Sequence, residues 1–149
     1  MRDEISDALK QAMQSKDKVK TNTLRLIMAA IKDRDIIHRE HGDGRIPDNE
    51  ILDVLTKMVK QRVESARLYE TGGRLELAND ELQEIEIIKE FLPQQLDPEE
   101  TETACQNAIN SCGASGLRDM GKVMETLKGQ YPGKMDFGKA SGIVKRILG

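Results

Sequence analysis

The sequence has few of the residues from which strands are built. Its 149 residues include no Trp, two Tyr and two Phe, and its apolar residues are mostly Leu, Ile, Met and Ala. Strands favour aromatic and β-branched runs, so this composition favours helices. A hydrophobic content of 38% is enough for a core, in one ordinary domain or two small ones. We therefore predict an all-α fold.

Long apolar runs are also absent. The first residues, "MRDEISDALKQAMQ", contain no apolar stretch of signal-peptide length. No window approaches the roughly 18 apolar residues that a bilayer-spanning helix needs. These absences predict a cytoplasmic protein that does not associate with a membrane.

Only two cysteines are present, and their spacing argues against a disulfide. Cys105 and Cys112 lie seven positions apart in what we predict to be one helix. At ~1.5 Å per residue their α-carbons would be about 10 Å apart, which is too far for a disulfide bond. We expect both to be reduced, small core residues.

Histidine is equally scarce, and no catalytic or metal-binding set is evident. His38 and His41 lie three apart near a predicted helix end, but no Cys or third His is nearby to complete a metal site. Both cysteines are far in sequence from either histidine, and Ser65 and Ser141 have no adjacent base. We therefore predict no catalytic residues, no metal and no cofactor, and the sequence does not argue for an enzyme that acts alone.

One stretch resembles a phosphate-binding P-loop. "GKMDFGKA", residues 133–140, fits the frame of Gly, four residues and Gly-Lys, but places Ala140 where a Ser or Thr would bind magnesium. A P-loop also requires a buried strand before the loop, whereas a turn after a helix precedes this one. We therefore expect Gly138 and Lys139 to lie inside the last helix, with Asp136 as its N-cap.

Apolar residues repeat every three or four positions in seven segments, which predicts seven helices. Asp48 and Asp97 are placed to act as N-caps of the third and fifth helices, and Pro93 ends the fourth. The segment "PQQLDPEE" is the one plausible linker. We predict a four-helix N-terminal bundle, residues 1–94, and a three-helix C-terminal domain, residues 95–149. The predicted helices cover residues 5–13, 18–39, 49–71, 75–91, 98–112, 119–128 and 136–148.

The apolar pattern also predicts which side chains form the core. The second helix is apolar from Leu24 to Ile31 except for Arg25, so we expect Arg25 to be partly buried and paired. In the fourth helix the periodic residues form an apolar face opposite an almost wholly acidic one. The periodic apolar residues of the third and fourth helices are Ile51, Leu52, Leu55, Met58, Val59, Val63, Ala66, Leu75, Ala78, Leu82, Ile85, Ile88 and Phe91.

The net charge of −3 is unevenly distributed. Residues 1–67 carry a net +2, residues 68–112 carry −9 and residues 113–149 carry +4. A polyanion would therefore meet the two ends of the chain and avoid the middle.

The third predicted helix carries a dense polar set in the segment "KMVKQRVESARLYETGGR". Residues at i, i+3 and i+4 share a face of a helix, so one ridge is formed by Lys57, Lys60, Gln61 and Glu64. Solvated ion pairs explain such a set, and a polar or anion-binding site is the alternative. The candidate site consists of Lys57, Lys60, Gln61, Arg62, Glu64, Ser65 and Arg74.

Basic residues recur in the last two predicted helices. Lys139, Gly142 and Arg146 stack at i, i+3 and i+7, and the small residues around them would let a phosphate approach closely. A basic solvated face is the alternative interpretation. The candidate nucleic-acid contacts are Lys122, Lys134, Lys139, Lys145 and Arg146.

Several longer segments together resemble one known family: "ALKQAMQSKDKVKTNTLRLIMAAIK", "NEILDVLTKMVKQRVESARLYETGGRLELANDELQEIEIIKEFLPQQL" and, in the tail, "DMGKVMETLK" with "GKMDFGKASGIVKRIL". The chain is similar over nearly its whole length to the YqeY-like proteins of the GatB/YqeY group. This resemblance implies four N-terminal helices followed by a three-helix tail. The tail is similar to the C-terminal domain of the B subunit of the tRNA-dependent Asp/Glu amidotransferase, which helps to hold the tRNA.

The resemblance and the +4 balance of the tail favour a non-catalytic tRNA- or RNA-binding accessory module, with tRNA or a tRNA-handling enzyme as its partner. The alternative is a carbon–nitrogen ligase that uses glutamine as amido donor and acts with a partner in tRNA-dependent amidation. These residues contain neither the large catalytic domain of that B subunit nor the Ser-Lys amidase machinery of its partner subunit. A protein-interaction adaptor that uses the acidic fourth helix is the third hypothesis.

Overall fold

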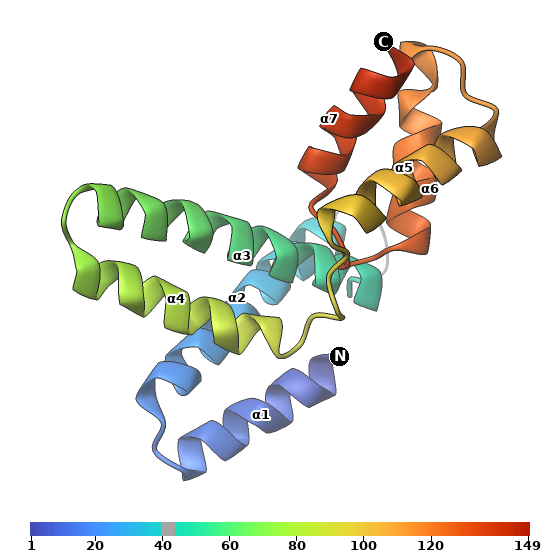
Figure 1. The fold of residues 1–149 in the computed structure, drawn as a ribbon. Helices are drawn as coiled ribbons and strands as arrows, with labels where there is room; N and C mark the ends of the chain where they lie inside the picture. The colour runs from blue at the N-terminus through green and yellow to red at the C-terminus, as the bar shows by residue number, and fades with distance from the viewer. Residues whose placement is uncertain (40–43) are drawn as a thin grey trace. The chain divides into compact units, whose positions relative to one another are not determined.

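The computed structural model describes residues 1–39 and 44–149, and every regular element in them is helical (Figure 1). No strand occurs in these two ranges, so the predicted all-α fold class is confirmed. A short 3-10 helix, η1 (Leu117–Asp119), precedes the sixth α-helix. The α-helices are α1 (Arg2–Gln14), α2 (Lys18–Arg39), α3 (Asp48–Thr71), α4 (Leu75–Lys89), α5 (Pro98–Cys112), α6 (Met120–Gln130) and α7 (Phe137–Leu148).

Contacts between residues divide the chain into two compact units, Met1–Leu92 and Pro93–Gly149. The first unit contains α1 to α4, and the second contains α5, η1, α6 and α7. Each unit has its own cluster of buried apolar side chains. None of the helices in the described ranges has the length and apolar content that a membrane span needs.

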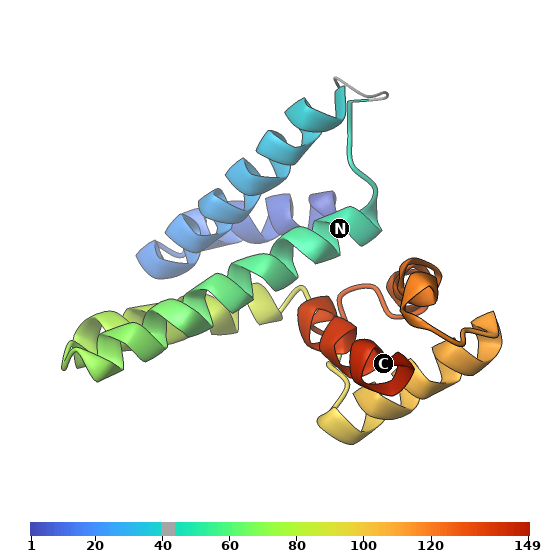
Figure 2. The same ribbon diagram turned by 90° about the horizontal axis from the view of Figure 1, so that it is seen from above.

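The helices of the first unit form two hairpins. α1 packs on α2 and α3 packs on α4, while α2 also contacts both α3 and α4. The α3–α4 pair lies antiparallel and side by side in both views (Figures 1 and 2). Burying a Leu or Ile side chain stabilises a fold by about 1.5–3 kcal/mol, so these contacts carry most of the stability of the unit. The fully buried core residues include Ile5, Leu24, Ile27, Ile51, Leu55 and Ile88.

An ion pair ties the start of α1 to the C-terminal half of α2. The Arg2 guanidinium donates hydrogen bonds to both carboxylate oxygens of Asp35, and the backbone N–H of Ile46 donates to the same carboxylate at 2.9 Å. The hydrogen bond from Arg2, against the effect of burial, holds the pKa of Asp35 at about 2, below its ordinary 3.8. Because the Asp35 side chain is only 11% exposed, solvent screens this pair weakly, and it fixes three segments of the unit together.

The outer half of the α3–α4 hairpin is less buried than the apolar pattern predicts. The turn at Gly72 and Gly73 lies clear of α1 and α2 in both views (Figures 1 and 2). Val63 is 52% exposed, Leu75 is 68% exposed and Leu82 is 46% exposed, although all three belong to the predicted apolar faces. The prediction of a continuous buried face is wrong here because two helices alone cover only the stripe that lies between them.

Two smaller expectations about the first unit are also wrong. Arg25 is exposed rather than partly buried. It follows the buried Leu24 by one position, which is about 100° around a helix of which only one face is covered. Asp48 is the first residue of α3 and not its N-cap, since Pro47 takes that position. The Asp48 carboxylate instead lies 3.7 Å from the N-terminal ammonium group of Met1.

In the second unit each of α5, α6 and α7 contacts the other two (Figure 2). Both cysteines are free thiols, as predicted. Cys105 is buried, with its Sγ 3.9 Å from the carbonyl oxygen of Ala140, and Cys112 lies 3.2 Å from the Thr126 hydroxyl. The side chains with no exposed surface include Cys105, Val123, Leu127, Ala140 and Val144.

Two predicted helix starts in the second unit are confirmed. The Asp97 carboxylate accepts from the Glu100 N–H at 2.7 Å, and the Glu100 carboxylate accepts from the Asp97 N–H, which completes a capping box at α5. The Asp136 carboxylate accepts from the Gly138 N–H at 2.8 Å and caps α7. Gly138 and Lys139 therefore lie inside α7, and the frame that resembles a P-loop is an ordinary helix start.

The predicted linker "PQQLDPEE" is anchored to the second unit. The Gln95 side-chain amide donates to the carbonyl of Gly133, and the Leu96 N–H donates to the carbonyl of Lys134 at 2.9 Å. Both acceptors lie in the turn between α6 and α7. Gln95 and Leu96 are consequently packed on the second unit.

Candidate nucleic-acid interface

The basic residues predicted to contact nucleic acid lie on three parts of the second unit. Lys122 is on α6 and Lys134 is in the turn that leads to α7. The other three, Lys139, Lys145 and Arg146, are on α7. Lys134 is half-buried and the others are exposed. The fold thus distributes the five cations over more than one face of the unit.

One face of α7 has the predicted arrangement. Lys139 and Arg146 are seven positions apart and so lie nearly in line along the helix, with Gly142 between them. No neighbouring atom lies within 4 Å of the position that a Cβ on Gly142 would take, so the backbone there is open to a ligand. Lys145 precedes Arg146 by one position and is turned away from this face by about 100°.

Arg146 already has an acidic partner on α5. Its guanidinium donates to Glu102 Oε1 at 2.7 Å, and the two side chains are 64% and 58% exposed. An exposed pair of this kind contributes at most about 1 kcal/mol, so a phosphate could replace Glu102 without a large loss. Lys139 and Lys145 have no ion pair within the described residues.

The second unit has no net charge, which refines the prediction of a basic tail. It carries seven Lys and Arg and seven Asp and Glu, and four of these acids lie between residues 97 and 102. A hollow of about 360 Å³ beside α5 is lined by Leu96 and Tyr131 together with the carboxylates of Glu99 and Glu100. Because these carboxylates repel a phosphate, an RNA would have to approach the α6 and α7 side of the unit.

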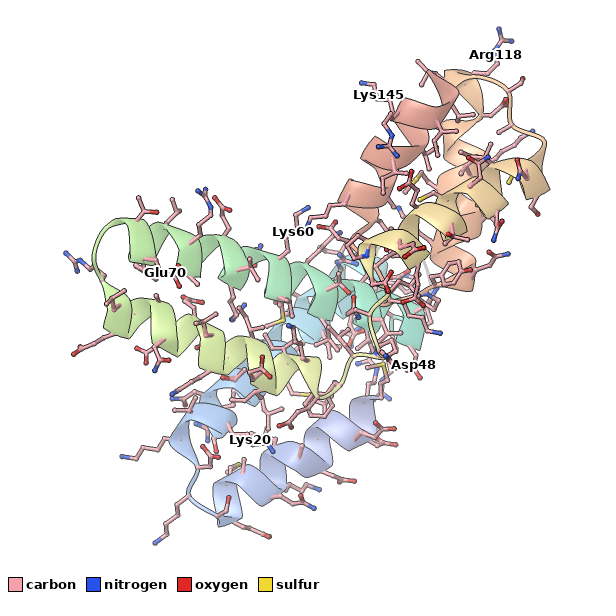
Figure 3. The ribbon with its side chains drawn as sticks, in the orientation of Figure 1. Lys20, Asp48, Lys60, Glu70, Arg118 and Lys145 are labelled. Atoms are coloured by element: carbon pink, nitrogen blue, oxygen red, sulfur yellow. The ribbon has the colours of Figure 1, made fainter. Side chains whose placement is uncertain are left out.

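A further cation stands at the end of the second unit where the chain terminates. Arg118 of η1 and Lys145 of α7 both project at this end (Figure 3). The Cδ2 atom of Leu117 lies 3.9 Å from the position that a Cβ on Gly149 would take, so η1 and the end of α7 are neighbours. Arg118 is absent from the sequence-based candidates because it is far from Lys145 in sequence and only the fold brings the two segments together.

The polar set of α3 separates into ion pairs, beginning with Lys57. Its Nζ lies 3.0 Å from Asp53 Oδ2, which also accepts from the Arg34 guanidinium of α2 at 3.1 Å. Burial raises the pKa of Asp53, but hydrogen bonds from Lys57 and Arg34 outweigh burial and hold that pKa below its ordinary value. Lys57 therefore takes part in a contact that joins α3 to α2.

Arg62 and Glu64 are paired as well. Arg62 Nε donates to Glu84 Oε2 of α4 at 3.0 Å, and Arg62 Nη1 donates to the Met58 carbonyl at 3.2 Å. Since its side chain is 14% exposed, Arg62 is part of the contact between α3 and α4. Glu64 accepts from Arg67 on the solvent side of the same helix, and this hydrogen bond lowers the pKa of Glu64.

The other four members of the polar set do not converge either. Lys60, labelled in Figure 3, is exposed on α3. Gln61 is exposed on the same helix, and Ser65 is half-buried. Arg74 is exposed and immediately precedes α4. Ion pairing within the first unit accounts for Lys57, Arg62 and Glu64, and it favours a structural role for this set over an anion site.

The histidines and cysteines assemble no reactive group in the described part of the chain. His38 is half-buried near the end of α2, and His41 lies outside the described residues. Among the described residues, no three His, Cys, Asp or Glu side chains are grouped as a metal ion would need. Burial, with a smaller effect from Glu102, raises the pKa of the Cys105 thiol, which makes it a poor nucleophile at neutral pH.

Comparison with protein families tests the resemblance carried by the sequence. A family model described as "Yqey-like protein" matches residues 2–148. The chain belongs to the YqeY-like family. The match covers nearly all of both units, so the predicted family membership is confirmed for the whole of the chain and not for its tail alone.

This YqeY-like chain is also similar to proteins named "Altered inheritance of mitochondria protein 41, mitochondrial". It is 40% identical to the one from Clavispora lusitaniae over 84 residues, which are 56% of this chain and 46% of the relative. It is 33% identical to the one from Meyerozyma guilliermondii over 137 residues, 91% of this chain and 64% of the relative. The Vanderwaltozyma polyspora protein is 30% identical over 104 residues, 68% of this chain and 55% of the relative.

These relatives correct one prediction and limit another. The chain spans about half the length of the curated relatives it matches. Their names describe them as mitochondrial proteins, and this finding overturns the prediction of a cytoplasmic protein.

Proposed function

We propose that this YqeY-like chain is a non-catalytic accessory module that binds the phosphate backbone of a structured RNA through its second unit. The observation that carries the proposal is the open face of α7. There Lys139 and Arg146 flank Gly142, whose backbone has no neighbouring atom over it. A bound phosphate would replace Glu102 as the partner of the Arg146 guanidinium, because that ion pair is exposed.

The same surface can be extended at its edges. Lys122 on α6, Lys145 on α7 and Arg118 on η1 are exposed and could each contact a further phosphate. Contacts of this kind position a nucleic acid without reading its sequence. The shape of a folded RNA would then decide which RNA is bound, since α5 presents carboxylates that repel phosphates on the neighbouring side of the unit.

We favour tRNA as the ligand because the tail resembles the domain that helps to hold tRNA in the Asp/Glu amidotransferase B subunit. In this proposal the module assists a tRNA-handling enzyme, and that enzyme performs the chemistry. The alternative is glutamine-dependent carbon–nitrogen ligase activity exerted together with a partner. Release of glutamate from glutamine in the presence of mischarged tRNA, ATP and a partner enzyme would support that alternative.

We also propose that residues 1–94 act as a four-helix N-terminal domain and residues 95–149 as a three-helix C-terminal domain. The two separate apolar clusters support this division. So does the anchoring of Gln95 and Leu96 to the turn between α6 and α7. In this arrangement the second domain carries the RNA contacts and the first is free to bind something else.

The experiment is binding of fluorescently labelled bulk tRNA to the full chain, followed by anisotropy over a series of salt concentrations. For contacts with phosphates, the logarithm of the affinity should fall with the logarithm of the salt concentration by about 0.7–0.9 per contact. The double variant Lys139→Glu and Lys145→Glu should weaken binding and lower this slope by roughly one to two.

The matched control makes the same change in net charge on the first unit, where Lys18 and Lys32 are exposed. Lys18→Glu with Lys32→Glu should leave tRNA affinity within about a factor of two. Equal losses from the two double variants would mean that net charge and not the α7 surface controls binding. The proposal would be rejected if the affinity for tRNA did not change with salt concentration, or if no binding were detected.

A further inference from the structure

The α3–α4 hairpin carries an exposed apolar surface that takes no part in the proposed RNA binding. Among the described residues, eleven large apolar side chains are exposed, and five of them lie on this hairpin. A folded chain exposes single apolar side chains routinely, but a group on one element marks an interaction site. The five are Val63, Leu68, Leu75, Leu77 and Leu82.

Three of these residues lie on the same side of the hairpin. Each precedes a buried residue by three positions: Val63 precedes Ala66, Leu75 precedes Ala78, and Leu82 precedes Ile85. Around the axis of its helix, each of the three is therefore rotated by about 60° from the buried residue that it precedes, and the direction of rotation is the same in each case. In an antiparallel pair, equal rotations bring side chains to the same side of the pair. We call this surface, formed by Val63, Leu75 and Leu82, the hairpin stripe.

An ion pair fixes how α3 and α4 are aligned along their axes beside the hairpin stripe. The ion pair between Arg62 and Glu84 joins them at 3.0 Å, one residue before Val63 and two residues after Leu82. Val63 and Leu82 therefore lie at nearly the same level. Leu75 lies two turns from Leu82 on the same line, toward the turn that is clear of α1 and α2 (Figures 1 and 2). The stripe is thus a shallow apolar surface across a rigid pair of helices.

Acids outnumber bases on α3 and α4, although two bases lie beside the stripe: Lys60 precedes Val63 by three positions, and Arg67, which is paired with Glu64 at 2.6 Å, follows it by four. Glu70 follows Val63 by seven positions and Glu86 follows Leu82 by four, so both lie on the same side of the hairpin as the stripe. Glu70, labelled in Figure 3, is exposed, and so is Glu86. Neither carboxylate has an ion pair within the described residues. Five acids and no Lys or Arg stand in α4 before Lys89, namely Glu76, Asp80, Glu81, Glu84 and Glu86.

The pKa of Glu81 shows the effect of the neighbouring acids on α4. Burial, followed by the charges of Glu84 and Asp80, raises the pKa of Glu81 above its ordinary value even though Arg62 acts in the opposite direction. Among the acids of α4, only Glu84 forms an ion pair in the described residues. Most of the negative charge of α4 is consequently not paired within the described residues of the first unit.

We propose that the hairpin stripe docks a basic amphipathic helix of a protein partner. Apolar side chains repeated at three- and four-residue spacing on that helix would cover Val63, Leu75 and Leu82. Lys and Arg side chains at its edges would meet Glu70 and Glu86. Charge complementarity selects this occupant, because the acids of α4 repel RNA and also repel a helix with acidic edges. The site is independent of the α7 surface that we propose for RNA.

The test uses two synthetic peptides of about 18 residues, long enough to form a helix on binding. Both carry Leu at helical spacing; one has Lys and Arg at every flanking position and the other has Glu. Binding of each labelled peptide to the full chain is followed by anisotropy at low and high salt. The basic peptide should bind and the acidic peptide should not, and high salt should weaken the basic one.

Variants locate the site. Leu75→Asn with Leu82→Asn should weaken binding of the basic peptide by roughly tenfold or more, since two apolar contacts are lost and no charge is added. The control is Ile37→Asn, which makes the same kind of change at one apolar residue of similar exposure, 57%, on α2. It should leave the affinity unchanged. Circular dichroism melting of each variant establishes that the fold is retained.

Three outcomes would overturn the proposal. One is binding of neither peptide, and another is equal binding of the two. The third is equal weakening by the hairpin variant and the Ile37 control. Sedimentation velocity of the full chain, with and without Leu75→Asn and Leu82→Asn, tests a different occupant. Self-association that these substitutions abolish would assign the stripe to a second copy of the chain and reject a basic partner.

Discussion

The two units bury their apolar residues to different extents. Of the eleven large apolar side chains exposed in the described residues, ten belong to the first unit and only Leu117 belongs to the second. Each of the three helices in the second unit contacts the other two, so every apolar stripe faces a partner. In the first unit α3 and α4 extend beyond α1 and α2, and a pair of helices cannot cover its own outer sides. The number of packing partners, and not the apolar pattern, decides what is buried.

Charge differs between the units in the same way. The second unit is neutral overall, with its acids on α5 next to its bases on α7, and Arg146 pairs with Glu102 across that boundary. The first unit concentrates acids on α4 with only one of them paired. A cation that is paired internally can exchange one anionic partner for another, whereas exposed acids without a partner attract a molecule of opposite charge.

The largest difference between the two units is expected when a cavity is created in the core of the second unit. Leu127→Ala removes a fully buried side chain at the contact of three helices and should cost about 3 kcal/mol, most of the stability of so small a unit. Hydrogen exchange measured by mass spectrometry should then show lost protection in α5 to α7 and unchanged protection in α2. Lost protection in both units would mean that they fold as one.

The second test removes the ion pair of the first unit. Asp35→Asn should destabilise α1 and α2 by about 2–3 kcal/mol, because the half-buried charge of Arg2 loses its partner. The folded-state pKa of Asp35, about 2, lies below the ordinary 3.8. The stability that it contributes is therefore present above pH 3.8 and is lost as the pH falls toward 2.

Acid unfolding measured by circular dichroism checks this prediction. The Asn variant should lose the part of the acid sensitivity that Asp35 contributes, while Asp3→Asn at an exposed position should behave as the parent. An acid transition of the same size in parent and Asp35→Asn would contradict the assignment. Protection of α5 to α7 should be unaffected, which keeps the effect within the first unit.

Two glycines of the second unit should respond in opposite directions. Gly113 ends α5 with φ +63, a left-handed conformation, so Gly113→Ala should cost about 1 kcal/mol although no atom crowds the site. Gly142 lies inside α7 in open space, so Gly142→Ala should gain about 0.5–1 kcal/mol. Thermal melts of the two variants measure both effects. The same Gly142→Ala should weaken tRNA binding if its backbone is approached by a phosphate.

The smallest stability effect is expected at the boundary between the acids and bases of the second unit. Arg146→Ala breaks an exposed pair and should change stability by less than about 1 kcal/mol. A melting temperature that falls as far as in Leu127→Ala would show that Arg146 is structural. An unchanged melt combined with weaker tRNA binding would separate its binding role from any contribution to the fold.

Local signals in the sequence determined the type and position of the helices. The apolar period placed them, and short-range chemistry at Asp97, Asp136 and Gly113 set their ends, since a cap depends on residues within one turn. The segments that resemble the YqeY-like family were sufficient to predict membership. The same local reasoning kept Gly138 and Lys139 inside a helix and out of a P-loop.

Tertiary structure alone decided which apolar and charged residues are covered. Val63, Leu75 and Leu82 repeat as regularly as the core residues beside them, but no element packs on their side of the hairpin. In the sequence, Arg62 is one cation of a polar set, and only the packing of α4 on α3 places Glu84 beside it. No feature of the sequence predicts that Asp35 pairs with Arg2. Periodicity records which residues share a face of a helix, whereas burial and ion pairing depend on what other segments lie opposite that face.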